Sequence, residues 1–343
     1  MRYLFIINPV AGTTNKESIT AKITEYAKAL GIDYRIIRTV APGDAEKIAR
    51  REAEAASDEI TIFSCGGDGT LNEVVNGVWG HENVTIGIMP IGSGNDFVRV
   101  FRANSDVYKA KQESSVDSNE QSEGESSRRL SYIVDAGKNI EPSLHPFLDL
   151  YAQVNGNTAT IDLLKVNNRL AINLANVGLD AVVARNMTKF RAWGRVHKEL
   201  PYSMGVLLAV LGPLNRKVEL AIDDEPFRTV KMTILVAGNG SYYGGGYYAT
   251  PEAILDDGLL DMSLIGSLNH FELPKLLSLY KQGEHLKHPA FNGRLMYGKC
   301  RKWQVRSKRP LTYACDGETT TAKEVTVSVI PKAVRILVPQ GLG

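Results

Sequence analysis

The sequence has little cysteine and no excess of either charge, and both absences narrow the choice of protein class. Three of the 343 residues are cysteines and none stands in a C-x-x-C spacing, which argues against a disulfide-stapled secreted protein and against a zinc site. Lysine and arginine number 40 and aspartate and glutamate 38, so the net charge of +2 argues neither for nor against nucleic acid. The remaining composition, 43% hydrophobic and 23% charged, is that of a globular chain long enough for two domains.

The sequence also lacks an apolar run long enough to cross a membrane. The N-terminal run at residues 3–7 is too short for the apolar region of a signal peptide. The most apolar later stretch, residues 202–214, contains two glycines and a proline and is too short to span a bilayer. We expect a helix that faces the core there, with a helix at the membrane interface as the alternative. The expected protein is cytoplasmic and able to associate peripherally with a membrane.

The first hundred residues alternate short apolar strands with segments of helical spacing. Strands are expected at 3–7, 33–38, 60–64 and 84–89, and helices at 19–30, 44–56, 70–78 and from about 96. Such alternation predicts a parallel sheet with right-handed crossovers. The four strands are followed by the loops N-P-V-A-G, T-V-A-P-G-D, C-G-G-D-G and P-I-G-S-G-N. Because ligands bind beyond the carboxyl ends of parallel strands, these loops predict a ligand site at that edge of the sheet.

Beyond about residue 160 the pattern changes to short, closely spaced β runs separated by turn signals. This pattern predicts an antiparallel sandwich or barrel. Two segments of helical character interrupt it, at about 181–214 and 270–283. Between the two halves, residues 103–129 hold almost no apolar side chains, and we expect a mobile surface insertion there.

The turn at residues 66–69, Gly-Gly-Asp-Gly, joins a buried strand to a helix. Thr70 and Glu73 fit a capping box, in which Thr70 caps this helix and Glu73 reaches back to its start. The N–H groups and the positive dipole end of the helix attract phosphate, and glycines let the backbone approach it. Asp68 is unfavourable beside phosphate unless it binds Mg²⁺, directly or through water. Alone, the motif is also compatible with a plain tight turn, and it is neither a Walker A loop nor a dinucleotide fingerprint.

This turn and the loop after the next strand together closely resemble the catalytic domain of the diacylglycerol kinase and lipid kinase family, in particular its bacterial members. The two segments are GGDGTLNEVVNG at 66–77 and PIGSGNDF at 90–97. Further similar segments are NPVAG at 8–12, TVAPGDA at 39–45, ANVGLDAVV at 175–183, residues 238–261 and CDGE at 315–318. GGDGT alone is shared with NAD kinases, whereas its combination with PIGSGNDF is specific.

The resemblance implies a fold and a domain division. It implies an α/β N-terminal nucleotide-binding domain of the NAD kinase and diacylglycerol kinase type, a mainly β, sandwich-like second domain, and a cleft between them. The nucleotide-binding domain is expected at 1–130 and the β-rich lipid-substrate domain at 131–330. The segment at 331–343 is expected to return to the first domain.

The resemblance also implies an ATP- and Mg²⁺-dependent lipid kinase. Glu318 would act as general base on the acceptor hydroxyl, Asp316 would support the site through a metal or by orienting Glu318, and Asp68 would hold the nucleotide's Mg²⁺. Taken without the resemblance, Asp316 and Gly317 are a common hairpin turn. The residues expected to bind the nucleotide are Asn8, Thr39, Gly66, Gly67, Asp68, Gly69, Thr70, Asn72, Gly92, Ser93 and Asn95.

A second metal is expected on the acidic segment A-I-L-D-D-G-L-L-D. The resemblance implies a structural Mg²⁺ held by the Asp257 carboxylate and by the carbonyls of Ile254 and Leu259. One carboxylate with carbonyls and waters suits such a hard cation. Asp256 and Asp261 are not among these expected ligands. The alternative is that the segment is a surface turn without a metal.

Two groups of basic residues bear on the partners. Residues 293–310 hold seven lysines and arginines and no acid, and residues 189–198 mix basic and aromatic side chains. Residues 293–310 can simply form a solvated face. Alternatively, their positive charge can attract anionic lipid headgroups. No motif in the sequence supports binding to nucleic acid. The resemblance allows a homodimer, which no feature of the sequence indicates.

The expected acceptor is a membrane lipid, most directly diacylglycerol, which would give phosphatidic acid. The acceptor pocket has no signature that can be recognised in the sequence, so a sphingoid base, ceramide or another lipid alcohol stays open. An NAD kinase-like activity is disfavoured by PIGSGNDF. A nucleotide-binding regulator without turnover would be expected to lack Asp68 or Glu318, and both are present.

Overall fold

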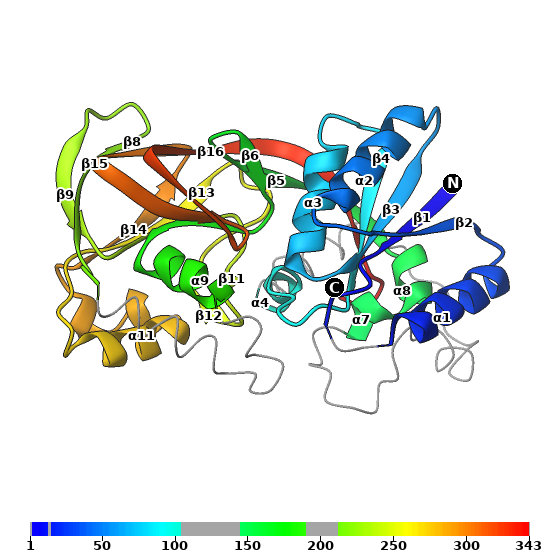
Figure 1. The fold of residues 1–343 in the computed structure, drawn as a ribbon, viewed down its shortest axis with the longest axis horizontal. Coiled ribbons are helices and arrows are strands. Elements are labelled where there is room, and N and C mark those ends of the chain that lie inside the picture. Colours follow the sequence, from blue (N-terminus) through cyan, green and yellow to red (C-terminus); the bar gives the residue numbers. More distant parts are fainter. Residues whose placement is uncertain (1, 13–14, 104–144, 190–211, 343) are drawn as a thin grey trace, which may run out of the picture. The chain divides into compact units, whose positions relative to one another are not determined.

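The computed structural model describes residues 2–12, 15–103, 145–189 and 212–342, and they divide into two compact units (Figure 1). The α/β unit comprises Met1–Ile161 and Lys332–Gly343, and the β-rich unit comprises Asp162–Pro331. Three predicted features lie largely outside the described residues: the insertion at 103–129, the basic and aromatic group at 189–198 and the apolar stretch at 202–214. Among the described residues no helix is long and apolar enough to cross a membrane.

The α/β unit is built on a parallel sheet in the order β4-β3-β1-β2. Its strands are β1 (Arg2–Ile7), β2 (Asp33–Arg38), β3 (Ile60–Gly66) and β4 (Val84–Pro90), which confirms the four predicted strands. The helices are α1 (Lys16–Ala29), α2 (Asp44–Ala55), α3 (Asp68–Val78), η1 (Phe97–Arg99), α4 (Val100–Ala103), α7 (His145–Leu148) and α8 (Leu150–Val154). The end of the long strand β16 (Glu318–Val338) pairs in parallel with β4 through Arg335 and Ile336.

Every residue of β3 and β4 is buried, as an uninterrupted apolar run predicts for inner strands of a parallel sheet. The rings of Phe5 and Phe63 stack with their centroids 4.7 Å apart. The compact α/β unit extends to residue 161, past the expected boundary at 130. The physical reason is that Leu148 and Leu150 join its core, and the Gln153 side chain donates to the Ile88 carbonyl of β4.

The β-rich unit is a mainly antiparallel sheet. Its strands are the second half of β5 (Asn157–Val166), β6 (Arg169–Ala171), β7 (Leu174–Gly178), β8 (Arg216–Ile222), β9 (Arg228–Met232), β10 (Ile234–Gly238), β11 (Tyr242–Tyr243), β12 (Tyr247–Tyr248), β13 (Leu260–Ile265), β14 (Leu295–Cys300), β15 (Lys302–Cys315) and most of β16. The helices are α9 (Leu179–Lys189), α11 (Leu273–Lys281), η4 (Glu284–Leu286) and η5 (Pro289–Phe291).

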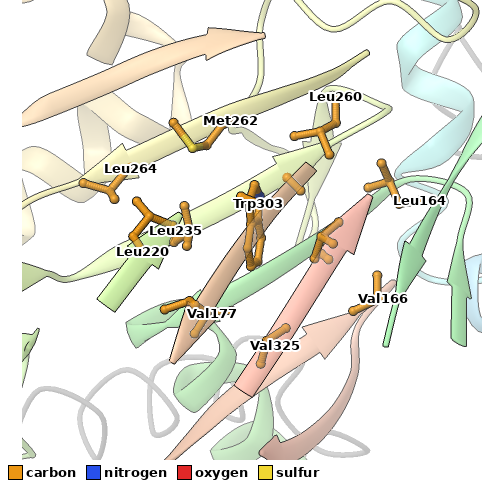
Figure 2. Packing of buried hydrophobic residues seen from close by; sticks show 14 of the residues in the cluster. Leu164, Val166, Val177, Leu220, Leu235, Leu260, Met262, Leu264, Trp303 and Val325 are labelled. Carbon is orange, nitrogen blue, oxygen red and sulfur yellow. The ribbon is translucent and has the colours of Figure 1, made fainter. Parts of the chain in front are cut away.

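The main sheet of this unit runs in the order β14-β13-β10-β7-β15-β16. Its core surrounds the fully buried Trp303, which Figure 2 shows among Val177, Leu235 and other side chains from several strands. The antiparallel β structure predicted from the short β runs is therefore confirmed.

Candidate functional site

The glycine-rich loops at the carboxyl ends of β1, β3 and β4 pack backbone against backbone. A Cβ atom on Gly92 would lie 2.3 Å from the Cα atom of Gly67, and one on Gly12 would lie 2.3 Å from the Ile91 carbonyl oxygen. The N–H groups of Ile91 and Gly92 both donate to the Gly66 carbonyl, at 2.9 and 3.1 Å. These glycines are therefore required by the contact between the loops, whatever ligand they also approach.

Asp68 joins the two motifs on which the family resemblance rests. It is the first residue of α3, and its Oδ1 accepts a hydrogen bond of 3.1 Å from the N–H of Phe97. A Cβ atom on Gly94 would lie 2.9 Å from Asp68 Oδ2, so a larger residue there would push this carboxylate oxygen aside. In proteins Mg²⁺ is commonly bound by one or two carboxylates together with substrate phosphates. A single carboxylate at a helix N-terminus beside these loops fits a Mg²⁺ that arrives with a nucleotide.

Two asparagines predicted to bind nucleotide use their side chains to fasten the loops. Asn95 has a positive φ of 55° and is buried; its Oδ1 accepts from the Gly92 N–H, and its Nδ2 donates to the carbonyls of Pro90 and Gly92. Asn8 Nδ2 donates to the Thr70 hydroxyl over 3.0 Å. Their contact with nucleotide stays a prediction, because these bonds show a structural role.

The other predicted nucleotide-binding residues lie in different settings, on loops and on α3. Thr39 is buried and its N–H donates to the Ile7 carbonyl, while Ser93 is exposed. Asn72 is buried in α3 and its Oδ1 accepts from the Asn76 side chain. A Cβ atom on Gly69 would meet no atom within 4 Å, so packing does not require a glycine there.

A small pocket lies beside the Gly-Gly-Asp-Gly turn within the α/β unit. Its lining residues are Ser64, Gly66, Gly67, Asp68, Leu71, Ile88, Pro90, Asn95, Phe97 and Val98. The Ser64 hydroxyl is buried and has no hydrogen-bond partner among the described residues. Sequence reasoning missed Ser64, although a serine at the end of the mostly apolar run I-T-I-F-S, just before the glycine-rich turn, was a signal for it.

The predicted capping box on α3 is wrong. The helix begins at Asp68, two residues before Thr70, and Gly67 occupies its N-cap position without a side-chain cap. The Glu73 carboxylate instead accepts from the N–H groups of Gly43 and Ala45, at 2.9 and 3.1 Å, and so caps the start of α2. Glu73 therefore does cap a helix, but the capped helix is the neighbouring α2, and Thr70 caps none of the described helices.

Asp316 and Gly317 form the two-residue turn between β15 and β16, both with positive φ, as in a type I′ hairpin. The Asp316 carboxylate accepts from three backbone N–H groups of one bend, those of Ile172, Asn173 and Leu174, at 2.8, 3.1 and 2.9 Å. Of its two predicted roles, this bonding favours fixing the turn that carries Glu318. The Glu318 side chain is exposed and makes no hydrogen bond or ion pair with the described residues.

Sequence reasoning missed a partly buried acid in the β-rich unit, Asp180. Asp180 Oδ2 accepts from the Tyr243 hydroxyl at 2.9 Å and from Asn176 Nδ2 at 2.7 Å, and Oδ1 accepts from the Ala181 N–H. Burial raises the pKa of Asp180 from 3.8 to about 6. The segment ANVGLDAVV was noted only as part of the resemblance, because its aspartate gains its partner from Tyr243, far along the chain.

The carboxylate assigned to a second metal is already engaged. Asp257 Oδ2 lies 2.8 Å from the Lys299 ammonium, and its Oδ1 accepts from the Leu259 N–H at 3.0 Å. No group of three or more His, Cys, Asp or Glu side chains suited to a metal ion occurs among the described residues. The donors around Asp257 therefore do not fit the predicted Mg²⁺ while Lys299 is in place.

Several basic side chains of residues 293–310 have acidic partners. Arg294 pairs with Glu272 at 2.8 Å and Arg306 pairs with Glu324 at 3.2 Å. Lys308 and Arg309 are exposed. The basic character available for an anionic partner is therefore smaller than the sequence suggests.

Comparison with known proteins accounts for most of the chain. A model of the diacylglycerol kinase catalytic domain matches residues 2–122, and a model of the YegS C-terminal NAD kinase beta sandwich-like domain matches residues 173–338. The chain belongs to the diacylglycerol kinase-like family of lipid kinases. The predicted fold class, an α/β nucleotide-binding domain followed by a mainly β, sandwich-like domain, agrees with both matches.

Individual relatives agree over nearly the full length. The chain is 27% identical over 321 residues to a diacylglycerol kinase of Staphylococcus epidermidis, covering 92% of this chain and 85% of that protein. It is 28% identical over 316 residues to a diacylglycerol kinase of Staphylococcus haemolyticus, covering 91% and 81%. The fold matches a crystal structure of a diacylglycerol kinase from Bacillus anthracis with a TM-score of 0.63 and 17% identity, covering 100% and 98% of the two chains.

Proposed function

We propose that this kinase transfers the γ-phosphate of ATP to the hydroxyl of diacylglycerol and so forms phosphatidic acid. The observation that carries the proposal is the hydrogen bond that the Phe97 N–H donates to Asp68, because it joins the two family motifs at the start of α3. Relatives named diacylglycerol kinase support this acceptor.

In this proposal the nucleotide lies at the carboxyl edge of the parallel sheet. The N–H groups of the first turn of α3 and those of residues 93–95 donate to its phosphates, and the helix dipole favours their negative charge. Gly69 lets the backbone approach without a Cβ in the way. Mg²⁺, held by Asp68, would neutralise charge that develops on the transferring phosphate.

Glu318 is the general base of the proposed reaction. It accepts the proton of the lipid hydroxyl while that oxygen bonds to the γ-phosphorus. The bond from this phosphorus to the bridging oxygen breaks, and ADP leaves with that oxygen. An exposed carboxylate on a fixed turn is suited to meeting a substrate hydroxyl, and the three bonds to Asp316 keep the turn in place.

The acceptor is embedded in a bilayer, so the protein must work at a membrane surface. We propose peripheral association with anionic lipid in the cytoplasm through exposed basic side chains such as Lys308 and Arg309. Binding to liposomes with and without anionic lipid tests this part, and equal binding to both would contradict it. No described feature favours nucleic acid or requires a homodimer.

An acceptor panel tests the proposed function. Purified protein, Mg²⁺ and γ-labelled ATP are incubated with mixed micelles of diacylglycerol, sphingosine or ceramide, and label is measured in the lipid. Transfer to diacylglycerol is expected. Transfer only to another lipid would keep the chemistry and change the acceptor. ATP binding without transfer to any lipid would contradict the proposal and favour a nucleotide-binding regulator.

A further inference from the structure

The acidic segment in the β-rich unit is organised around one ammonium group. Asp261 on β13 lies directly opposite Lys299 on β14, and Lys299 Nζ lies 2.8 Å from an oxygen of Asp261 and 2.8 Å from an oxygen of Asp257. The third donor of the ammonium reaches the Glu252 carbonyl oxygen at 3.1 Å. An ammonium has three donors, and here all three have oxygen partners.

We propose that the Lys299 ammonium is the structural cation of residues 252–261, in the place where the sequence pattern predicts a divalent metal. The loop then owes its order to a cation attached to the chain, and its stability does not depend on the concentration of Mg²⁺ or Ca²⁺.

The remaining oxygens of the two carboxylates support this proposal. Asp257 Oδ1 accepts from the Leu259 N–H at 3.0 Å, and Asp261 Oδ1 accepts from the Tyr297 hydroxyl at 2.7 Å. Every oxygen of both carboxylates therefore already has a partner. A divalent cation at this place would compete with the Lys299 ammonium for these oxygens and would be repelled by its charge.

Burial explains why a cation is needed at this place. The Asp261 side chain is only 2% exposed, and a carboxylate that far from water is costly unless it is paired. A neighbouring contact holds the loop without metal as well, because buried Asp162 accepts from the Gly258 N–H at 2.7 Å. Removing the ammonium would leave two carboxylates and a carbonyl converging on one place, a set of oxygen donors suited to Ca²⁺ or Mg²⁺.

The test is thermal unfolding of the full chain without nucleotide, in EDTA, Mg²⁺ or Ca²⁺. All proteins carry Asp68→Asn, which removes the other predicted metal ligand. With Lys299 present, the melting temperature is expected to be the same in all three buffers. Lys299→Met is expected to lower it in EDTA by roughly 5–10 °C, and added cation should restore it progressively as the concentration rises. Lys308→Met, at an exposed lysine of β15, is the matched control. It should change neither the melting temperature in EDTA nor the response of the melting temperature to added cation.

A melting temperature that rises with Mg²⁺ or Ca²⁺ while Lys299 is intact, and no longer rises after Asp257→Asn, would overturn the proposal. If Lys299→Met does not fold without added cation, that cation requirement itself supports the proposal. If Lys299→Met does not fold with cation either, the test uses two proteins that keep Lys299, one with Asp257 and one with Asp257→Asn. The proposal expects that Mg²⁺ or Ca²⁺ changes the melting temperature of neither protein.

Discussion

At the scale of single residues, the glycines of the phosphate-binding edge serve two different purposes. Gly92 has the Gly67 backbone where a Cβ would be, whereas Gly69 has open space. The sequence assigns both to nucleotide binding because it shows the glycines without showing what they face. Packing between the loops requires a glycine at position 92, whereas only the approach of a ligand would require one at position 69.

Alanine substitution separates these purposes. Gly92→Ala should lower the free energy of unfolding by about 1–3 kcal/mol, because two backbones must move apart. Gly69→Ala should keep or raise it by up to about 1 kcal/mol, since alanine is favoured in a helix, yet weaken ATP binding. Urea denaturation and ATP titration measure the two effects. Unchanged ATP affinity in Gly69→Ala would remove this glycine from the binding site.

Asp180 gives a residue-scale prediction about pH. Its folded-state pKa of about 6 lies above the usual 3.8, so the protonated form is favoured by folding. The resulting stability is complete below pH 3.8 and is lost as the pH rises through 6. Relative to Asp180→Asn, the wild-type protein should therefore lose up to about 3 kcal/mol between pH 4 and pH 7.5. Denaturation of both proteins at several pH values measures this, and a difference independent of pH would contradict it.

The same scale shows what the sequence could and could not predict of the site. Residue types at the carboxyl edge and in the Asp-Gly turn followed from local patterns. The partners of Asp316 lie more than 140 residues away, and Lys299, the partner of Asp257, lies on β14, 42 residues further along the chain. A local pattern contains no information on such partners, so the acidic segment suggested a metal where the fold supplies an ammonium.

At the scale of elements, α2 and α3 are linked through one side chain. The two helices pack against each other (Figure 1), and Glu73 of α3 supplies the N-terminal cap of α2. The sequence predicted both helices within two residues of their observed bounds, since apolar spacing and terminal glycines are local. Which helix Glu73 caps depends on tertiary packing, and the sequence pattern predicted α3 where the structure shows α2.

Glu73→Ala should lower the free energy of unfolding by about 1–2 kcal/mol, because two N–H groups lose an anionic acceptor. Amide hydrogen exchange locates the effect: the N–H groups of Gly43 and Ala45 should exchange faster than in wild type. Glu82→Ala, at an exposed glutamate outside the helices, is the control. Faster exchange at residues 68–71 with no change at Gly43 would contradict the observed cap.

At the scale of the whole molecule, the order of strand types was predictable and the long-range pairing was not. Alternating strands and helices indicated the parallel sheet, and short β runs indicated the antiparallel one. The sequence predicted a separate C-terminal segment from residue 331, but β16 is continuous from Glu318 to Val338. Its residues pair with β15 in one unit and with β4 in the other, which no local pattern reveals.

The central claim is that Glu318 removes the proton of a lipid hydroxyl during phosphate transfer from ATP. The most direct test compares the wild-type protein with Glu318→Gln in transfer of labelled phosphate to diacylglycerol. Glu324→Gln, at another exposed glutamate of β16, is the matched control. We predict that Glu318→Gln lowers kcat about 10²–10⁴-fold and leaves the Kd for ATP unchanged, while Glu324→Gln behaves as wild type. Wild-type kcat in Glu318→Gln would contradict the account.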